Sequence, residues 1–210
     1  PFLVNAGIQN GGQTCSASSR ILVHRSRYNE VVDHMSQKYK DLIVRPAIND
    51  GALGPLISER QKSIVEDFIS KGQRLNLVAQ GKIDSSAPTK GHYVAPHLFA
   101  DVPEDHILAK DEIFGPVQVI MPFDTEEEAI SIANGTDYGL VASIWTNDGA
   151  RQMRLAKKLK SGQVFINNYG AGGGVELPFG GRGFSGHGRE KGFEALYGFS
   201  TLKTVASYHQ

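Results

Sequence analysis

Short apolar runs alternate with amphipathic segments along most of the chain. The apolar runs are rich in β-branched and aromatic residues and predict buried strands over residues 21–23, 74–79, 92–102, 116–123, 140–145 and 163–167. Between them, apolar positions recur at helical spacing and predict helices over residues 27–42, 59–71, 126–133 and 149–161. Strands that alternate with helices are typical of βαβ units, so we expect an α/β fold in which helices flank a largely parallel sheet.

Three of the expected helices carry start signals. Ser58 and Thr125 each stand three residues before a Gln or a Glu, which is the capping-box pattern, and Asp148 is a third N-cap residue. The helix that follows Ser58 is expected to turn three apolar residues toward the core, namely Ile64, Phe68 and Ile69.

The last third of the chain loses this alternation. Residues 169–192 are rich in glycine and show little periodicity, while residues 201–209 alternate like a strand and have no following helix to cover them. A terminal strand without a local partner is a candidate for pairing with another subunit. We therefore expect residues 193–210 to form an oligomerisation segment with a C-terminal strand, in a homo-oligomer.

Composition narrows the class of partner. The 22 Lys and Arg residues balance the 22 Asp and Glu residues, so charge gives no reason to expect nucleic acid or an anionic membrane surface. The apolar runs are too short to span a bilayer. One cysteine excludes an intrachain disulfide framework and makes the cytoplasm the expected location. The opening PFLVNAGIQNG lacks an initiator Met and signal-peptide features, so we expect a chain entered in mid-sequence.

The single cysteine, Cys15, lies in the small-residue stretch NGGQTCSASSR. A free cysteine is most often a small buried hydrophobic residue. Here, however, Gly11 and Gly12 allow the backbone to approach a ligand closely. A helix beginning near Gln13 would place the thiol in its first turn, where the helix dipole favours a thiolate. Such a thiol is suited to nucleophilic attack on a carbonyl.

A second candidate lies in KDEIFGPV, residues 110–117, where Glu112 is followed by the large apolar residues Ile113 and Phe114 and by a rigid Gly-Pro turn. It is either a solvated loop acid or a carboxylate with a fixed direction. A fixed carboxylate suits hydrogen bonding to ribose hydroxyls.

Two other patterns do not indicate a site. Residues 181–186, GRGFSG, match G-x-G-x-x-G, but the preceding ELPF is not a strand and no acid follows at the required spacing. We therefore reject a dinucleotide fingerprint there. His92 and His97 have no carboxylate or thiol to complete a ligand set, so we expect no metal site.

In this order, NGGQTCSASSR, DEIFGPV, GQVFINNY and PFGGRGFSGHGREKG closely resemble segments of the aldehyde dehydrogenase superfamily, and the resemblance extends to the C-terminus. It implies oxidation of a small-molecule aldehyde to a carboxylic acid, with NAD or NADP as the cofactor. It implies Cys15 as the nucleophile that forms a thiohemiacetal and then a thioester. It also implies roles for four other residues: Glu112 would bind the nicotinamide ribose, Phe114 would pack near the nicotinamide, Asn167 would belong to the catalytic-site scaffold, and Phe179 would line the aldehyde tunnel.

The chain also departs from the family pattern. Gly183 stands where the family often carries Lys. Glycines within residues 171–177 stand where many relatives carry a bulky aromatic residue over the aldehyde, which suggests a roomier mouth and leaves the identity of the aldehyde undecided. In the family, most of the dinucleotide-binding domain, the general-base glutamate and an oxyanion-hole asparagine precede the nucleophile. Only 14 residues precede Cys15 here. We therefore expect residues 1–192 to be an incomplete catalytic domain, inactive alone, whose cofactor is bound mainly by a domain outside this chain.

Three alternatives remain open. A CoA- or phosphate-dependent acyl reductase of the same superfamily also uses a cysteine thioester, although the Gly-Gln-x-Cys and Glu-x-Phe-Gly-Pro motifs together favour the hydrolytic branch. A non-catalytic assembly scaffold would need neither Cys15 nor Glu112. A cysteine hydrolase would need a histidine partner, and none of the 7 histidines lies in a recognisable partner motif. The sequence does not decide which aldehyde is oxidised, whether the cofactor is NAD or NADP, or whether the protein is a dimer or a tetramer.

Overall fold

A four-stranded sheet forms the centre of the computed structural model, which describes residues 2–170 and 174–210. Its strand order is β1-β6-β5-β3; β1 and β5 run parallel to β6, and β3 runs antiparallel to β5. Two further pairs, β2 with β4 and β7 with β8, are also parallel. The largely parallel sheet expected from the sequence is therefore confirmed. The strands are β1 Arg20–His24, β2 Ile43–Val44, β3 Asn76–Gln80, β4 Lys82–Ile83, β5 His97–Ala100, β6 Val117–Phe123, β7 Val141–Ile144 and β8 Gln163–Ile166.

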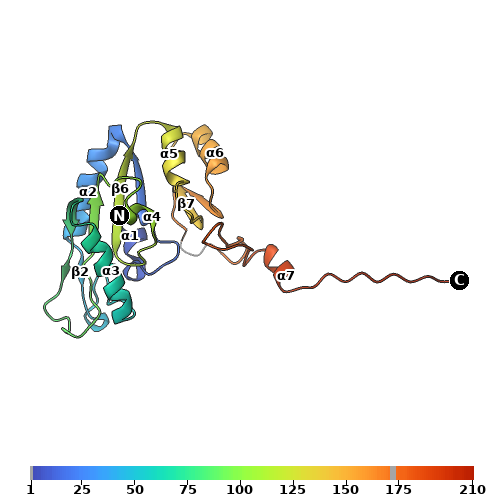
Figure 1. Ribbon diagram of the computed structural model, residues 1–210, viewed down its shortest axis with the longest axis horizontal. Coiled ribbons are helices and arrows are strands. Elements are labelled where there is room, and N and C mark those ends of the chain that lie inside the picture. Colours follow the sequence, from blue (N-terminus) through green and yellow to red (C-terminus); the bar gives the residue numbers. More distant parts are fainter. Residues whose placement is uncertain (1, 171–173) are drawn as a thin grey trace.

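Helices flank the sheet, and the view in Figure 1 shows α1 and α2 near β6, with α5 and α6 together beside β7. Short 3-10 helices join several elements: η1 Gln9–Gly12, η2 Arg25–Arg27 and η3 Ala47–Asn49. The α-helices are α1 Phe2–Ile8, α2 Tyr28–Lys40, α3 Glu59–Lys71, α4 Ile107–Lys110, α5 Glu126–Ala133, α6 Gly149–Lys158 and α7 Glu194–Gly198.

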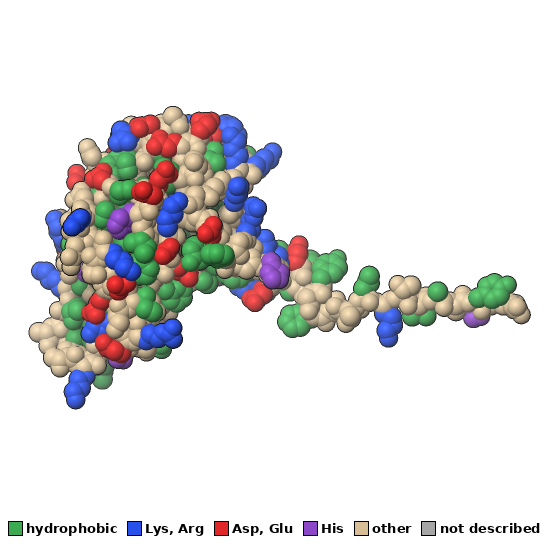
Figure 2. Space-filling view, in the orientation of Figure 1, with side chains coloured by type: hydrophobic (Ala, Val, Ile, Leu, Met, Phe, Trp, Pro, Cys, Tyr) green, Lys and Arg blue, Asp and Glu red, His purple; other side chains and the backbone are tan. Residues whose placement is uncertain are grey.

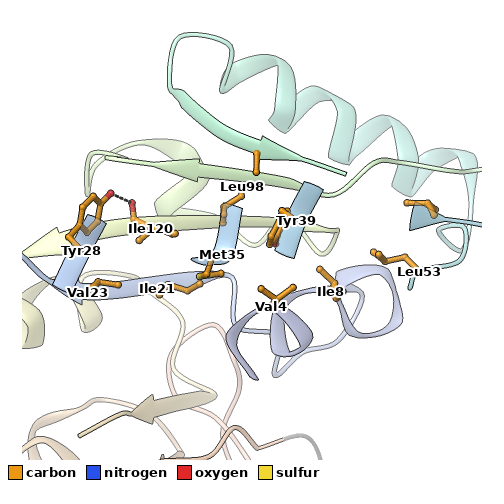
Figure 3. Packing of buried hydrophobic residues seen from close by; sticks show 12 residues of the cluster. Val4, Ile8, Ile21, Val23, Tyr28, Met35, Tyr39, Leu53, Leu98 and Ile120 are labelled. Carbon is orange, nitrogen blue, oxygen red and sulfur yellow. Dashed lines mark hydrogen bonds between the residues drawn. The ribbon is translucent and has the colours of Figure 1, made fainter. Parts of the chain in front are cut away.

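The strand β6 is apolar along most of its length because its two faces lie in two separate cores. Val117, Val119 and Met121 pack with residues of α3, α4 and α5, whereas Ile120 packs with residues of α1 and α2. Figure 3 shows the core on the α1 and α2 side. A strand that is buried on both faces has a continuous apolar sequence rather than an alternating one. The two cores together fix the position of β6 and of the turn at residues 112–116 that precedes it, which contributes to the candidate site.

The predicted helix starts are confirmed. The side chains of Ser58, Thr125 and Asp148 each accept a hydrogen bond from a backbone N–H in the first turn of the helix that follows. The expected inner face of α3 is partly wrong. Ile64 is 36% exposed, and its neighbour Val65 is fully buried in its place. Phe68 and Ile69 pack against the core as expected. Only Ile64 was misplaced, by one residue, because Ile64 and Val65 are equally apolar and the sequence does not choose between them.

The C-terminal tail differs from the strand that was expected over residues 201–209. Residues 200–210 form neither helix nor strand, and the tail runs away from the body of the molecule in Figure 1. A strand needs a backbone partner, and this tail pairs with no strand within the described chain. Figure 2 shows apolar side chains spaced along it, and Leu202, Val205 and Tyr208 are almost fully exposed. Pairing with another subunit therefore stays a prediction.

Within residues 2–170 and 174–210, every helix is too short or too polar to cross a bilayer.

Candidate active site

Cys15 lies exposed in the loop between η1 and β1. No helix begins near Gln13: the segment from Gln13 to β1 contains turns, and α1 lies before the thiol. The φ angles of Asn10, Gly11 and Gly12 are 53°, 65° and 74°, so the chain leaves α1 through a left-handed run. Glycine adopts this conformation without steric cost. The helix-dipole argument for the thiol does not apply, because the nearest helix ends before it.

The side chain of Gln13 holds this loop in place. Its Nε2 donates to Asn10 O at 3.0 Å, and its Oε1 accepts from the backbone N–H of Ile57 at 2.9 Å. The Asn10 side chain donates in return to Gln13 O at 3.1 Å. No role was predicted for Gln13 beyond its place in the motif. Its position two residues before the thiol was the available signal, but hydrogen bonds inside an irregular loop leave no periodic pattern.

We refer to residues 10–19 as the Cys15 loop. At Gly12 its backbone packs against the backbone of the Glu-x-Phe-Gly-Pro segment. A Cβ atom placed on Gly12 would lie 2.1 Å from Gly115 O and 2.8 Å from Pro116 N. No real Cβ atom approaches backbone that closely, so only glycine allows the two segments to meet. Two motifs about 100 residues apart in the sequence thus lie in direct contact.

The turn that carries Glu112 and Phe114 is anchored on both sides. Ile113, between them, is buried in the core, whereas the side chains of Glu112 and Phe114 are exposed. The Gln61 amide donates to Ile113 O at 3.1 Å and to Phe114 O at 3.0 Å. Phe114 has φ = 55°, an uncommon left-handed conformation for a bulky residue. Glu112 and Phe114 therefore extend outward from a fixed turn, which fits a carboxylate for a ribose diol next to an aromatic ring.

Asn167 comes directly after β8 and closes the β7–β8 pair. Its Oδ1 accepts from the Thr146 N–H at 2.9 Å, and its Nδ2 donates to Thr146 O at 3.0 Å. The ring of Phe2 in α1 lies 5.9 Å from that of Trp145 and 6.5 Å from that of Tyr169. These ring contacts join the end of β7–β8 to α1, the helix that leads into the Cys15 loop. The hydrogen bonds of Asn167 itself are with Thr146 and β7.

Phe179 belongs to the irregular segment behind β8. Its backbone pairs with Glu190 through two 2.7 Å hydrogen bonds, and the Lys191 ammonium lies 5.6 Å from the centre of its ring. These contacts hold Phe179 to the segment that follows it and do not bring it to the Cys15 loop. The glycine-rich stretch expected to open the aldehyde mouth lies partly outside the described residues, at 171–173.

Two surface hollows accompany this arrangement. One of about 390 Å³ lies beside the Glu112 turn and is lined in part by Lys110, Asp111 and Tyr138. Another of about 540 Å³ lies beyond the carboxyl ends of β5 and β6, and Cys15 lines neither. Among the described residues, no set of three or more His, Cys, Asp or Glu side chains is placed to hold a metal ion.

Comparison with known proteins gives one consistent family. The sequence model described as "Aldehyde dehydrogenase family" matches residues 1–205. A betaine aldehyde dehydrogenase of Rhizobium leguminosarum is 36% identical over 197 residues, which cover 92% of this chain and 40% of that protein.

Two solved structures show the same fold. One is a protein from Burkholderia cenocepacia that has been assigned as an aldehyde dehydrogenase. It has a TM-score of 0.95 at 57% sequence identity, and the match covers 98% of this chain and 44% of that protein. The NAD⁺ complex of an aldehyde dehydrogenase from Bacillus cereus has a TM-score of 0.90 at 37% identity and covers 97% of this chain and 41% of its own. The chain thus spans about two fifths of the length of the proteins it matches.

Proposed function

Because the chain belongs to the aldehyde dehydrogenase family, we propose that it carries the nucleophile of an enzyme that oxidises an aldehyde to a carboxylic acid with NAD or NADP. The observation that supports this most is the backbone contact between Gly12 and Gly115. It holds the Cys15 loop against the turn that presents Glu112 and Phe114. This contact supports the proposal because it would hold the proposed nucleophile next to the proposed cofactor-binding turn.

In this proposal the reaction proceeds through a covalent bond to Cys15. The Cys15 thiolate attacks the carbonyl carbon of the aldehyde, and the C–S bond gives a thiohemiacetal whose oxyanion the Cys15 backbone N–H helps to stabilise. Loss of hydride from that carbon restores the C=O bond and leaves a thioester. Water then attacks the thioester carbon, the C–S bond breaks, and the carboxylic acid and the free thiol are released. Within residues 1–210 the Cys15 side chain is exposed.

The nicotinamide cofactor, when bound, supplies the acceptor for the hydride. On this chain, Glu112 would hold it by hydrogen bonds to ribose hydroxyls and Phe114 by contact with its nicotinamide end. The related Bacillus cereus and Mycobacterium tuberculosis enzymes are described as NAD⁺ complexes, which supports the same class of cofactor here. We propose Asn167 and Phe179 as parts of the catalytic scaffold and of the aldehyde tunnel.

The proposed activity is that of the protein at its full natural length. We propose that most of the cofactor site and the general base lie in a part of the protein outside these residues, and we therefore expect residues 1–210 alone to be inactive. Residues 1–192 are proposed as the catalytic unit and residues 193–210 as the oligomerisation segment. The single cysteine in 210 residues fits a reducing compartment, and we propose the cytoplasm.

Steady-state oxidation of an aldehyde panel by the full-length protein tests this function. Cys15→Ser is expected to lower kcat by at least about 10³-fold because the hydroxyl is a far weaker nucleophile. Ser16→Ala, the neighbouring substitution, is the matched control and is expected to change kcat by less than about threefold. A Cys15→Ser variant with wild-type kcat would contradict the proposal. Formation of an acyl-CoA or acyl phosphate in place of the acid would instead support the acyl reductase alternative.

A further inference from the structure

The side chain of Gln118 interrupts the apolar core that β6 forms with α1 and α2. Gln118 lies in β6 and is fully buried, and it shares with Ile120 the face that packs against α1 and α2. A buried amide without partners is costly, so each of its polar atoms needs a hydrogen bond. A glutamine in the middle of a doubly buried strand therefore requires an account of its contacts.

The Gln118 amide is fully engaged. Its Nε2 donates to Leu3 O at 3.0 Å and to Ser18 O at 2.5 Å. Its Oε1 accepts from the Tyr39 hydroxyl at 2.6 Å. The two carbonyls fix the orientation of the amide, because an amide oxygen placed there would face two other acceptors. Burial raises the pKa of Tyr39, so its hydroxyl stays protonated and keeps donating.

The two carbonyls bound by this amide stand at the two ends of the segment that carries the nucleophile. Leu3 belongs to α1, which leads into the Cys15 loop, and Ser18 lies between Cys15 and β1. The backbone N–H of Ser18 also donates to Ala6 O at 3.0 Å. A Cβ atom on Gly7 would lie 2.1 Å from the Gln118 amide, so the helix needs a glycine where the amide reaches it. The helix that leads into the Cys15 loop and the far end of that loop therefore meet at the Gln118 amide.

We propose that Gln118, oriented by Tyr39, is a positioning residue that fixes the Cys15 loop for attack on the substrate. This inference rests on the proposed role of Cys15 as the nucleophile. Because the side chains of Gln118 and Tyr39 are fully buried, they act through the loop. Loss of the clamp leaves Cys15 present but displaced, which lowers the rate of the chemical step more than it weakens substrate binding.

Tyr39→Phe is the variant that tests this inference, because it removes one hydroxyl and leaves the ring in place. Tyr28→Phe is the matched control. Tyr28 lies on the same helix, is also buried, donates to Ile120 O at 3.3 Å and accepts from the Asp101 N–H at 2.7 Å. Its hydroxyl makes no contact with the Cys15 loop in these bonds. Gln118→Glu is a second variant: a protonated carboxyl offers one O–H donor for two carbonyls.

Two measurements on the full-length protein decide the outcome. In Tyr39→Phe and Gln118→Glu, we expect hydrogen exchange in peptides covering residues 14–19 to be roughly tenfold faster, and in Tyr28→Phe to be unchanged. We expect kcat to fall roughly fivefold or more with KM within about twofold for the first two variants only.

Equal effects of Tyr39→Phe and Tyr28→Phe on loop exchange would overturn the inference and leave the clamp a purely structural feature. Faster loop exchange with an unchanged kcat in an active enzyme would overturn it as well. If the wild-type protein oxidises no aldehyde while the exchange difference persists, the proposed function fails and the clamp on the loop stands.

Discussion

Gly12 shows how far the site depends on a single residue. Its φ of 74° is left-handed, and an added Cβ would lie 2.1 Å from Gly115 O. An alanine there would strain the backbone and also separate the Cys15 loop from the Glu112 turn. Neither effect is relieved by moving a flexible side chain, because both partners are backbone.

We expect Gly12→Ala to lower the free energy of unfolding by about 2–4 kcal/mol, from the left-handed strain and the overlap together. Urea unfolding measures this value. Gly149→Ala, at the first position of α6, where an added Cβ would meet open space, is the control. It is expected to be neutral or to stabilise by up to about 1 kcal/mol. Equal unfolding free energies for the two variants would show that Gly12 and Gly115 are not packed as described.

The sequence allowed some of these residues to be identified and not others. Cys15 and Glu112 were recognisable because each stands in a short motif whose chemistry depends on residue type. Gln13, Gln61 and Gln118 were not, because their roles depend on backbone carbonyls and N–H groups that only the folded chain brings near. Gln118 left one signal, a polar residue inside an apolar strand.

At the scale of elements, α5 and α6 are joined at both ends. The Glu126 carboxylate accepts from Arg154 at 2.9 and 3.0 Å and from Arg151 at 3.3 Å. Near the other end of α5, the Asn134 side chain donates to Lys158 O at 3.0 Å and accepts from the Lys160 N–H at 2.7 Å. These bonds fix the helices that pack beside β7 and β6.

Hydrogen bonding to Arg154 lowers the pKa of Glu126 below its ordinary value of 4.5, and Arg151 adds to the shift. A depressed carboxyl pKa contributes stability that is fully present above the unfolded-state value and is lost as the pH falls through the folded-state value. We therefore expect wild type to be more stable than Glu126→Gln at neutral pH, with a difference that shrinks below the ordinary value of 4.5.

Thermal unfolding of both proteins from neutral to acid pH measures this difference. Glu127→Gln, an exposed glutamate in the same helical turn, is the control and is expected to show a smaller difference at every pH. A Glu126→Gln difference that grows as the pH falls would contradict the assignment.

Some helices could be predicted from the sequence and others could not. The capped helices α3, α5 and α6 were predicted because side-chain caps have a local sequence signature. The helix α1 was not, since its FLVNAGI sequence carries no cap and includes Gly7, a poor helix former that is present to admit the Gln118 amide. No helix forms after Gln13 for a related reason: small residues near a motif do not by themselves specify a helix.

At the scale of the whole molecule, the parallel α/β arrangement followed from the alternation of apolar runs and amphipathic stripes, whereas the C-terminal tail did not. A tail whose apolar side chains are exposed in one chain has a structure that depends on a partner. We expect it to pair with another copy and to hold the homo-oligomer together.

Leu202→Asp in the full-length protein tests this assembly. Burying a charge in a subunit interface is costly, so we expect the assembly to dissociate at micromolar concentration, as measured by light scattering after size-exclusion chromatography. Lys203→Gln, the adjacent substitution, is the control and is expected to keep the wild-type molar mass. A Leu202→Asp protein with unchanged molar mass would contradict the assignment of the tail.

The central claim is that Cys15 forms the covalent bond to the substrate. The measurement that tests it most directly is peptide mass mapping of the full-length protein, quenched with acid during turnover of an aldehyde and NAD⁺. We expect the acyl group of the substrate to be found on the peptide containing Cys15, as a thioester that hydroxylamine removes. Formation of NADH with no acyl group on that peptide, or with an acyl group on another residue, would contradict the account.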